Sequence, residues 1–327
     1  MKQYPEHVNW AGLDVSAKHF DAALASKGQR FPSTPARELP WKRFMRTESG
    51  VQQFLQWLGE LVKDDAQTEV RAVMEATGNY SVELAAWLLK LRPGLLPAIE
   101  NPSRTHDYIN SLGLRNKTDG LDARGLAFYG AERNPAPYEP LTPEREELRA
   151  LTRYRDALVN ERTALKNRMH ERCPSKTVNA MCARQLRQLN RDIEKLEKEM
   201  ERVIRQSPEL NRDYELLLTI PGTGHITACV ILSELGDLRR FERARQLTAY
   251  AGLSPKIFKS GSSVRKKTHM CKKGNSRVRR VLFLSSMAAL HTRSRNDLKD
   301  TYQKICEEGK PGKLALGAIM RKQLVIM

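Results

Sequence analysis

The stretch VNWAGLDV, residues 8–15, has the apolar character of a buried β-strand and carries an acidic residue near its end. Working outward, residues 20–25 resemble its hairpin partner, and further strands are predicted at residues 70–75, which also end in an acid, and at residues 95–99. Helical spacing of apolar residues is found at residues 48–63, 84–91 and 118–133. The first 130 residues therefore predict an α/β domain.

Length and composition narrow the class of protein. A chain of 327 residues with 40% hydrophobic residues can form two or three packed domains. No run approaches the roughly 18–20 apolar residues of a membrane span, and the first twelve residues lack the apolar core of a signal peptide. The five cysteines lie at long, irregular spacings, which argues against a zinc ribbon or a disulfide scaffold. We therefore expect a reduced cytoplasmic protein that does not enter membranes.

Charge is distributed unevenly along the chain. Residues 1–130 hold 16 basic and 15 acidic side chains, whereas residues 131–327 hold 40 basic and 23 acidic ones. An asymmetry of this size predicts that the C-terminal part meets a polyanion, while the N-terminal part has another task. A solvated basic surface is the alternative.

Residues 141–208 have the composition of a coiled-coil segment. Glu, Lys and Arg fill the positions between apolar residues that recur in steps of three and four, namely Leu186, Leu189, Ile193, Leu196, Met200 and Val203. Such a pattern favours self-association. An intramolecular pair of helices would produce the same pattern.

The remaining residues, 209–327, predict a mainly helical domain with two features suited to nucleic acid. The first is the turn at Gly222 and Gly224 between two apolar helices, which resembles a helix-hairpin-helix whose backbone N–H groups face a phosphate. An ordinary tight turn between core helices is the alternative for this feature.

The second feature is the basic segment at residues 256–280. Ten of its 25 residues are Lys or Arg and none is acidic, so we predict a loop that lies on a nucleic-acid backbone. A solvated run of charge is again the alternative. The candidate contacts outside the turn are Lys259, Arg265, Lys266, Lys267, Lys272, Lys273, Arg277, Arg279 and Arg280.

Four acids of the N-terminal part form a candidate catalytic group. Asp14 and Glu75 end predicted strands, and Asp119 and Asp122 share one face at the start of a predicted helix. Like charges brought together raise one another's pKa, a cost that bound divalent cations remove. Magnesium takes oxygen ligands, and two such ions about 4 Å apart suit phosphodiester chemistry. Scattered surface acids are the alternative interpretation.

The motifs around these acids resemble a known family. GLDVS (12–16), MEATGNY (74–80) and RNKTDGLDAR (115–124) are similar to the three acidic blocks of DEDD transposases of the insertion-sequence 110 family. In the C-terminal part, IPGTG (220–224), AYAGLSP (249–255) and SGSSVR (260–265) are similar to that family's transposase domain. The six blocks occur in the family's order over nearly the whole chain.

This resemblance implies the architecture, α/β plus α: a RuvC-like domain of RNase H type at residues 1–140, coiled-coil helices at 141–208 and a mainly helical C-terminal transposase domain at 209–327. It implies a recombinase that moves its own element, guided by a structured non-coding bridge RNA that pairs with target and donor DNA. It further implies a homo-oligomer, from dimer to tetramer, in a prokaryotic cytoplasm, associated with the nucleoid when active.

The resemblance also assigns the catalytic residues. By motif, Asp14, Glu75, Asp119 and Asp122 bind Mg²⁺, two ions per site, and Ser260 is the nucleophile. Composition alone does not distinguish Ser260 from Ser262 or Ser263, and the family motif selects the serine before Gly261.

Two other classes of function remain open at this stage. One is a metal-dependent, structure-selective nuclease, similar to a Holliday-junction resolvase, that uses the acids with water and forms no serine adduct. The other is a non-catalytic protein that binds nucleic acid. Ser260 separates the first of these from a serine recombinase.

Overall fold

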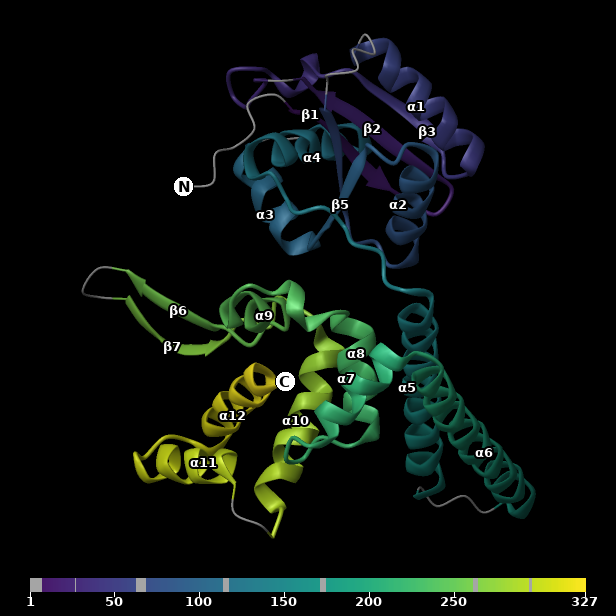
Figure 1. Cartoon of the computed structure of the whole chain (residues 1–327), viewed down its shortest axis with the longest axis vertical. Coiled ribbons are helices and arrows are strands. Elements are labelled where there is room, and N and C mark those ends of the chain that lie inside the picture. Colours follow the sequence, from purple (N-terminus) through teal and green to yellow (C-terminus); the bar gives the residue numbers. More distant parts are fainter. Residues whose placement is uncertain are drawn as a thin grey trace. The chain divides into compact units, whose positions relative to one another are not determined.

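The computed structural model describes residues 8–26, 28–62, 69–113, 118–170, 175–260, 264–293 and 296–327, with only the backbone of 257–260 and 264–268. The chain forms two compact units, Met1–Pro140 and Leu141–Met327 (Figure 1). Among the described helices, none is both long and apolar enough to cross a membrane.

The first unit is built on a five-stranded mixed sheet. Its strands are β1 (Val8–Val15), β2 (His19–Ala25), β3 (Trp41–Met45), β4 (Glu69–Glu75) and β5 (Leu96–Glu100). They lie in the order β3-β2-β1-β4-β5, in which β1, β4 and β5 are parallel and β2 and β3 run antiparallel to their neighbours. The carboxyl ends of β1 and β4 therefore lie side by side at one edge.

Helices cover both faces of this sheet. They are α1 (Glu48–Val62), α2 (Asn79–Leu91), α3 (Pro102–Ser111) and α4 (Asp119–Arg133), with a short 3₁₀ turn η1 (Ala36–Glu38). Because side chains alternate along a strand, Leu13 of β1 packs in the core with α1 and α2, whereas Trp10 packs in the core with α3 and α4. The result is three layers, helix–sheet–helix.

The predicted strands at 8–15, 20–25, 70–75 and 95–99 and the helices at 48–63, 84–91 and 118–133 are confirmed to within a few residues at each boundary. Two elements had no sequence signal. Strand β3 buries only Phe44 among exposed neighbours, and α3 buries only Thr105 and Tyr108, so neither shows a full apolar stripe.

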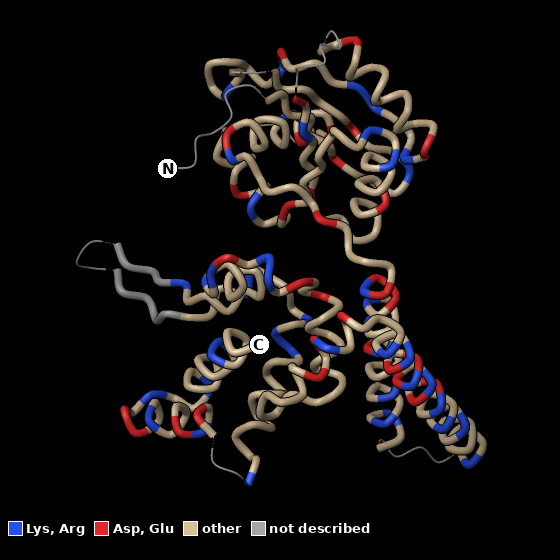
Figure 2. The backbone as a smooth tube through the Cα atoms, viewed as in Figure 1, with Lys and Arg blue, Asp and Glu red and all other residues tan. Residues whose placement is uncertain are grey.

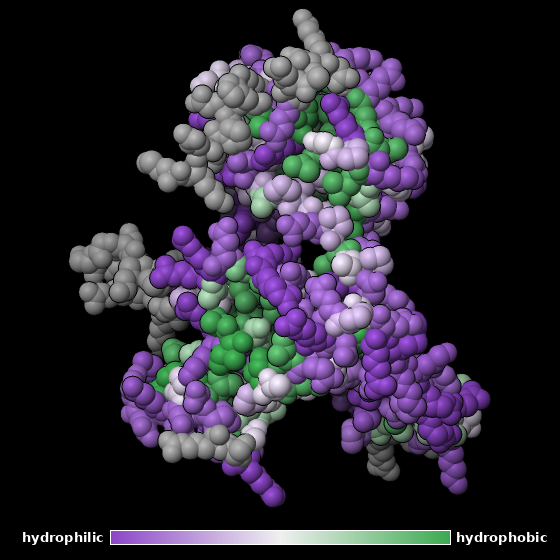
Figure 3. Space-filling model, viewed as in Figure 1, coloured by the Kyte–Doolittle hydropathy of each residue, from purple (hydrophilic) through white to green (hydrophobic). Residues whose placement is uncertain are grey.

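The second unit begins with two long helices, α5 (Pro143–His170) and α6 (Lys176–Gln206), which pack on each other. Leu158 and Leu165 of α5 meet Leu189 and Ile193 of α6 in one apolar cluster. The heptad-like pattern is thus buried within the chain, as the intramolecular alternative predicts. Basic and acidic residues interleave on the outside of this pair (Figure 2), and its surface is largely hydrophilic in the view of Figure 3.

The rest of the second unit is a helical core that carries one two-stranded ribbon. Its helices are α7 (Pro208–Leu218), α8 (His225–Leu235), η2 (Leu238–Arg240), α9 (Ala244–Tyr250), α10 (Ser276–His291), α11 (Asp297–Glu307) and α12 (Gly312–Ile326). Helix α8 is buried along most of its length and packs with α5, α7 and α10 around the largest apolar cluster.

The prediction of a loop over residues 256–280 was wrong. Strands β6 (Pro255–Ser260) and β7 (Val264–Met270) form an antiparallel ribbon there, and α10 begins at Ser276. Residue types that favour strands lie among the basic residues of this segment and were not given weight in the prediction. They are Ile257, Phe258, Val264 and Thr268.

One glycine sets the distance between β1 and α4. A Cβ atom on Gly12 would lie 2.1 Å from the carbonyl oxygen of Ala123 and 2.2 Å from the amide nitrogen of Ala127, both in the backbone of α4. Only glycine permits this contact. Helix α4 therefore lies directly on β1, and its first turn comes to the carboxyl end of that strand.

We predict that Gly12→Ala destabilises the protein by about 3 kcal/mol, because α4 must move off the sheet to admit the methyl group. Urea unfolding followed by circular dichroism measures the loss. Gly94→Ala is the matched control, since a Cβ on Gly94 meets no atom within 4 Å. Equal stability of the two variants would contradict the role assigned to Gly12.

Candidate active site

The strand ends and the start of α4 position the four acids predicted from the sequence. Leu13 pairs with Met74 across the parallel strands β1 and β4, so the next residues, Asp14 and Glu75, lie at neighbouring strand ends. Asp119 and Asp122 lie in the first turn of α4, whose N-terminus the Thr118 side chain caps by accepting a hydrogen bond from the Leu121 N–H.

Asp14 is the acid whose ionisation its surroundings change most clearly. Burial, as the largest cause, and neighbouring negative charge raise the pKa of Asp14 to about 7. The carboxylates that raise it are, in decreasing order of effect, those of Asp122, Asp119, Glu75 and Asp21. The other three predicted acids therefore lie within electrostatic reach of Asp14.

Asp21 is a fifth acid that sequence reasoning missed. It pairs with Asp14 across the antiparallel strands β1 and β2, and only 1% of it is exposed. Its carboxylate accepts hydrogen bonds from the indole N–H of Trp41 (3.0 Å) and from Nε of Arg43 (3.1 Å). The Asp14–Asp21 pairing follows from the register of the predicted hairpin, which was the available signal.

Arg43 links this buried acid to the start of α4. Its Nη2 lies 3.1 Å from Oδ2 of Asp21 and 2.7 Å from Oδ2 of Asp119. The two carboxylates in turn raise the pKa of the arginine, chiefly through the hydrogen bond to Asp21. Arg43 thus supplies one positive charge to a site that holds five carboxylates.

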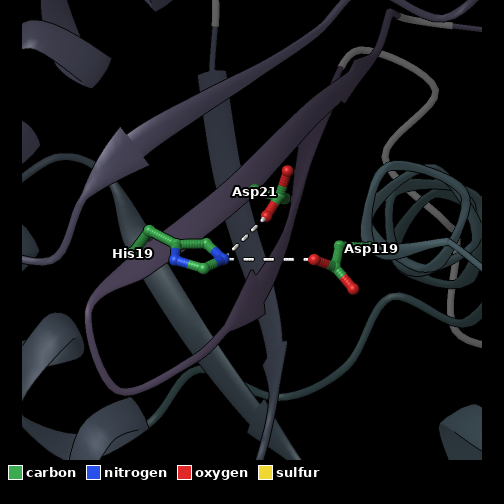
Figure 4. Close-up of side chains that lie close together, drawn as sticks. All are labelled: His19, Asp21 and Asp119. Atoms are coloured by element: carbon green, nitrogen blue, oxygen red, sulfur yellow. Dashed lines mark ion pairs between the residues drawn. The ribbon is translucent and has the colours of Figure 1, made fainter.

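His19 completes the tightest group of metal-ligating side chains among the described residues. One ligand atom each from His19, Asp21 and Asp119 lie within 4.8 Å of one another. Figure 4 shows the imidazole facing both carboxylates, with Nε2 3.9 Å from Asp21 and 4.0 Å from Asp119. Within the described chain, no three of the four predicted acids meet this distance condition.

Glu75 is held by a hydroxyl from the neighbouring helix. Thr105 of α3, which is fully buried, donates a hydrogen bond of 2.6 Å to Oε1 of Glu75. This hydrogen bond holds the Glu75 carboxylate in one direction. This contact comes from an element without a sequence signal, so it could not be predicted.

The donor set suits a hard divalent cation. Carboxylate oxygens dominate it, as Mg²⁺ and Mn²⁺ require, and a carboxyl with a pKa near 7 is one that a cation would stabilise as the anion. Asp14, Glu75, Asp119 and Asp122 fit this role, with Asp21 and His19 as further donors beside them.

The predicted nucleophile lies in the second unit. Ser260 is the last residue of β6, and its backbone pairs with Val264 of β7. Lys259 pairs with Arg265, and Lys266 and Lys267 lie further along β7. Gly261, Ser262 and Ser263 lie outside the described residues, as do Arg115, Asn116 and Lys117 of the third acidic block.

The two glycines predicted to contact phosphate, in the turn between α7 and α8, have different surroundings. Gly222 has a φ of +80°, and a Cβ there would lie 2.2 Å from the carbonyl oxygen of Ser285 in α10. This glycine therefore serves close packing between helices. A Cβ on Gly224, at the N-terminus of α8, meets no atom within 4 Å.

Three of the predicted basic contacts take part in interactions inside the second unit. Arg279 donates to the carbonyls of Ala251 (3.0 Å) and Gly274 (2.8 Å), and burial lowers its pKa. Arg277 and Arg280 both pair with the buried Asp156. Lys272 and Lys273, by contrast, are exposed.

The fold and the site define a class. A mixed sheet of this order, with acids gathered at the carboxyl ends of its central strands, is compatible with an RNase H-like domain of the DEDD type. A family profile for DEDD transposases of the IS110 type, described as "Transposase", matches residues 11–174. A second profile, described as "Transposase IS116/IS110/IS902 family", matches residues 214–303.

Curated relatives agree with the profiles. The pilin gene-inverting proteins of Moraxella bovis and Moraxella lacunata are each 30% identical over 97% of this chain and 94% of their own length. The transposase for insertion sequence element IS1111A of Coxiella burnetii is 27% identical over 78% of this chain and 76% of its own. The chain belongs to the IS110 family of DEDD transposases and is a DNA transposase or recombinase.

We predict that Asp14→Asn stabilises the metal-free protein at about pH 8. The pKa of Asp14 in the folded chain is about 7, whereas that of an aspartate in an unfolded chain is about 3.9, so the charged aspartate costs stability as the pH rises between these values. After allowance for partial exposure, the gain is about 1 kcal/mol, with a smaller gain at about pH 5. Thermal unfolding in a chelator measures it.

Glu60→Gln is the control for this experiment, because it removes an exposed carboxylate of α1 outside the acidic site. If the acids bind Mg²⁺, the ion should raise the unfolding temperature of the unaltered protein, and Asp14→Asn should lose that rise. A gain that is equal at both pH values, or a loss of stability at about pH 8, would contradict the raised pKa.

We predict that substitution of Arg279 lowers the stability of the protein, whereas substitution of Lys272 lowers its affinity for DNA. Arg279→Gln should cost about 1–3 kcal/mol of stability, because two partly buried backbone carbonyls lose their donor. Lys272→Gln should leave stability unchanged and lower affinity for duplex DNA, reducing the slope of log affinity against log salt by about 0.9 if Lys272 meets one phosphate. Urea unfolding and fluorescence anisotropy separate the two; an unchanged slope would remove Lys272 from the interface.

Proposed function

We propose that this protein is an RNA-guided DNA recombinase that cuts and rejoins target and donor DNA through Ser260 and a magnesium-binding carboxylate site. The observation that carries the proposal is that Asp122, Asp119 and Glu75 lie near enough to Asp14 to add to the larger effect of burial, and together these effects raise the pKa of Asp14 to about 7. Such a site needs a cation, and a cation among carboxylates suits phosphodiester chemistry.

Asp14, Glu75, Asp119 and Asp122 would hold Mg²⁺, two ions per site. When bound, the metal supplies Lewis-acid activation of the attacking oxygen and charge stabilisation at the phosphate. The chain's own residues prepare the site: Thr105 fixes Glu75, and Arg43 holds Asp119. Asp21 anchors Arg43 from the sheet.

Ser260 would form the covalent link. Its oxygen bonds to the scissile phosphorus as the bond from phosphorus to one sugar oxygen breaks, the serine gives up its proton, and the leaving sugar oxygen gains one. Rejoining reverses these steps with another strand's hydroxyl, so the number of phosphate esters is conserved and no nucleotide triphosphate is consumed. Lys259, Arg265, Lys266 and Lys267, which flank Ser260 on the ribbon, would stabilise charge at the phosphate.

A structured guide RNA would choose the DNA, as the family resemblance implies, so few side chains need to read bases. The same resemblance implies a dimer-to-tetramer assembly in which the acids of one subunit meet the serine of another. The excess of 40 basic over 23 acidic residues in 131–327 supports contact with these nucleic acids. In this proposal the protein acts in the cytoplasm and on the nucleoid.

We predict that Ser260→Ala abolishes strand exchange and the covalent protein–DNA species while guide-RNA binding survives, because only the attacking oxygen is lost. Denaturing gels with labelled DNA, cognate RNA and Mg²⁺ detect the adduct. Ser262→Ala and Ser263→Ala are the matched controls and should retain it. Cleavage by Ser260→Ala at the rate of the unaltered protein would favour the resolvase-like alternative.

We predict that Glu75→Ala lowers the rate of DNA cleavage at least about a hundredfold, because a metal ligand is lost. Quantified DNA cleavage measures the loss. Glu60→Gln should retain full activity, and unchanged cleavage by Glu75→Ala would remove the claim of a metal site.

A further inference from the structure

An open cavity of about 420 Å³ lies beside the acidic site of the first unit. Its volume is in the range of pockets that hold small ligands. The residues that line it are Trp41, Arg43, Thr118, Asp119, Gly120 and Arg124. It thus combines one of the catalytic acids with an aromatic ring and two guanidinium groups.

Trp41 is held in place and yet remains accessible. Its indole N–H donates to the buried Asp21 (3.0 Å), and a Cβ on Gly120 would lie 2.8 Å from the ring, so α4 lies against it. Despite these contacts 41% of Trp41 is exposed. A tryptophan on an edge strand with a fixed ring and a large exposed area is a stacking platform for a planar group.

In the part of the chain that the structure describes, no carboxylate pairs with the Arg124 guanidinium. Among the described residues its only hydrogen bond runs from Nε to the Leu39 carbonyl (3.0 Å), and it makes no ion pair there. Its guanidinium lies 5.9 Å from the centre of the Trp41 ring. Burial, with no opposing charge, lowers the pKa of this arginine.

The two arginines of the cavity therefore differ. Arg43 is already neutralised by Asp21 and Asp119. Arg124 keeps most of its five N–H donors for an anion that enters from outside, since a guanidinium matches the geometry of a phosphate.

We propose that this cavity binds one nucleotide of the DNA strand next to the scissile phosphate, with the phosphate on Arg124 and the base stacked on Trp41. The proposal rests on the proposed function, because a strand that is cut at the acids must pass the cavity that Asp119 shares with them. The exposed ring fits a base, and the unpaired cation fits the adjoining phosphate.

Photocrosslinking tests this assignment. The full-length protein in Mg²⁺ is mixed with short single-stranded DNA that carries one 5-iodouracil, irradiated, and digested for mass spectrometry. We expect the crosslink on Trp41. Arg124→Gln should lower its yield about tenfold and reduce the salt slope of DNA affinity by about 0.7, the loss of one single-strand phosphate contact.

Matched variants separate binding from structure. Arg30→Gln removes an exposed arginine of the same unit outside the cavity and should retain the crosslink. Arg124→Lys keeps the charge and should retain most of the affinity, whereas a purely structural role at Leu39 would make Arg124→Lys and Arg124→Gln equal. Thermal unfolding of each variant shows that it is folded.

Several outcomes overturn the proposal: crosslinks that leave Trp41 unmodified, equal losses in Arg124→Gln and Arg30→Gln, or a crosslink from 5-iodouridine RNA that replaces the one from DNA. Ser260→Ala distinguishes failure of the function. If Ser260→Ala still cuts DNA and the Trp41 crosslink forms, the nucleotide site is retained and the serine mechanism is rejected. If Ser260→Ala does not cut DNA and no Trp41 crosslink forms, the nucleotide site alone is rejected.

Discussion

Close contact between β1 and α4 is the constraint on which the acidic site depends. Because Gly12 has no Cβ, the backbone of α4 rests on the strand and brings two aspartates of its first turn to Asp14. The packing energy of two apolar layers thus holds carboxylates together against their repulsion. Burial and, after it, this repulsion raise the pKa of Asp14 to about 7, and in the proposed function a cation would offset both.

A second network of hydrogen bonds and ion pairs, centred on Asp21, limits the repulsion among the carboxylates. Asp21, buried in the middle of the sheet, is bonded by Trp41 and Arg43 of the neighbouring strand β3, and Arg43 reaches on to Asp119. The buried carboxylate of Asp21 therefore fixes both the Trp41 ring at the edge of the site and the Arg43 guanidinium that pairs with Asp119. Loss of a buried charged partner is expensive, so this strand pair contributes to site geometry as well as to the core.

The strand ends with Asp14 and Glu75 and the helix start with Asp119 and Asp122 could be predicted, because apolar periodicity places each acid at an element boundary. Asp21 could have been found from the register of the predicted hairpin, in which it pairs with Asp14. Arg43 and Thr105 lie in elements that were not predicted, so their contacts with the acids were missed. In the second unit, charge composition identified a basic segment but not its ribbon. Nor could it distinguish Arg279, which bonds backbone carbonyls, from the exposed Lys272.

The division of charge between the two units has a chemical logic. The unit with the acids has nearly balanced charge, so its catalytic group repels nucleic acid unless cations or other protein surfaces compensate it. The strongly basic second unit would hold DNA in the proposed function, and among its described residues no group of side chains is placed to bind a metal ion. Neither part alone combines affinity with chemistry. In the proposed function, a strand is therefore broken only where both parts converge on it, and isolated copies of either are harmless to the DNA they meet.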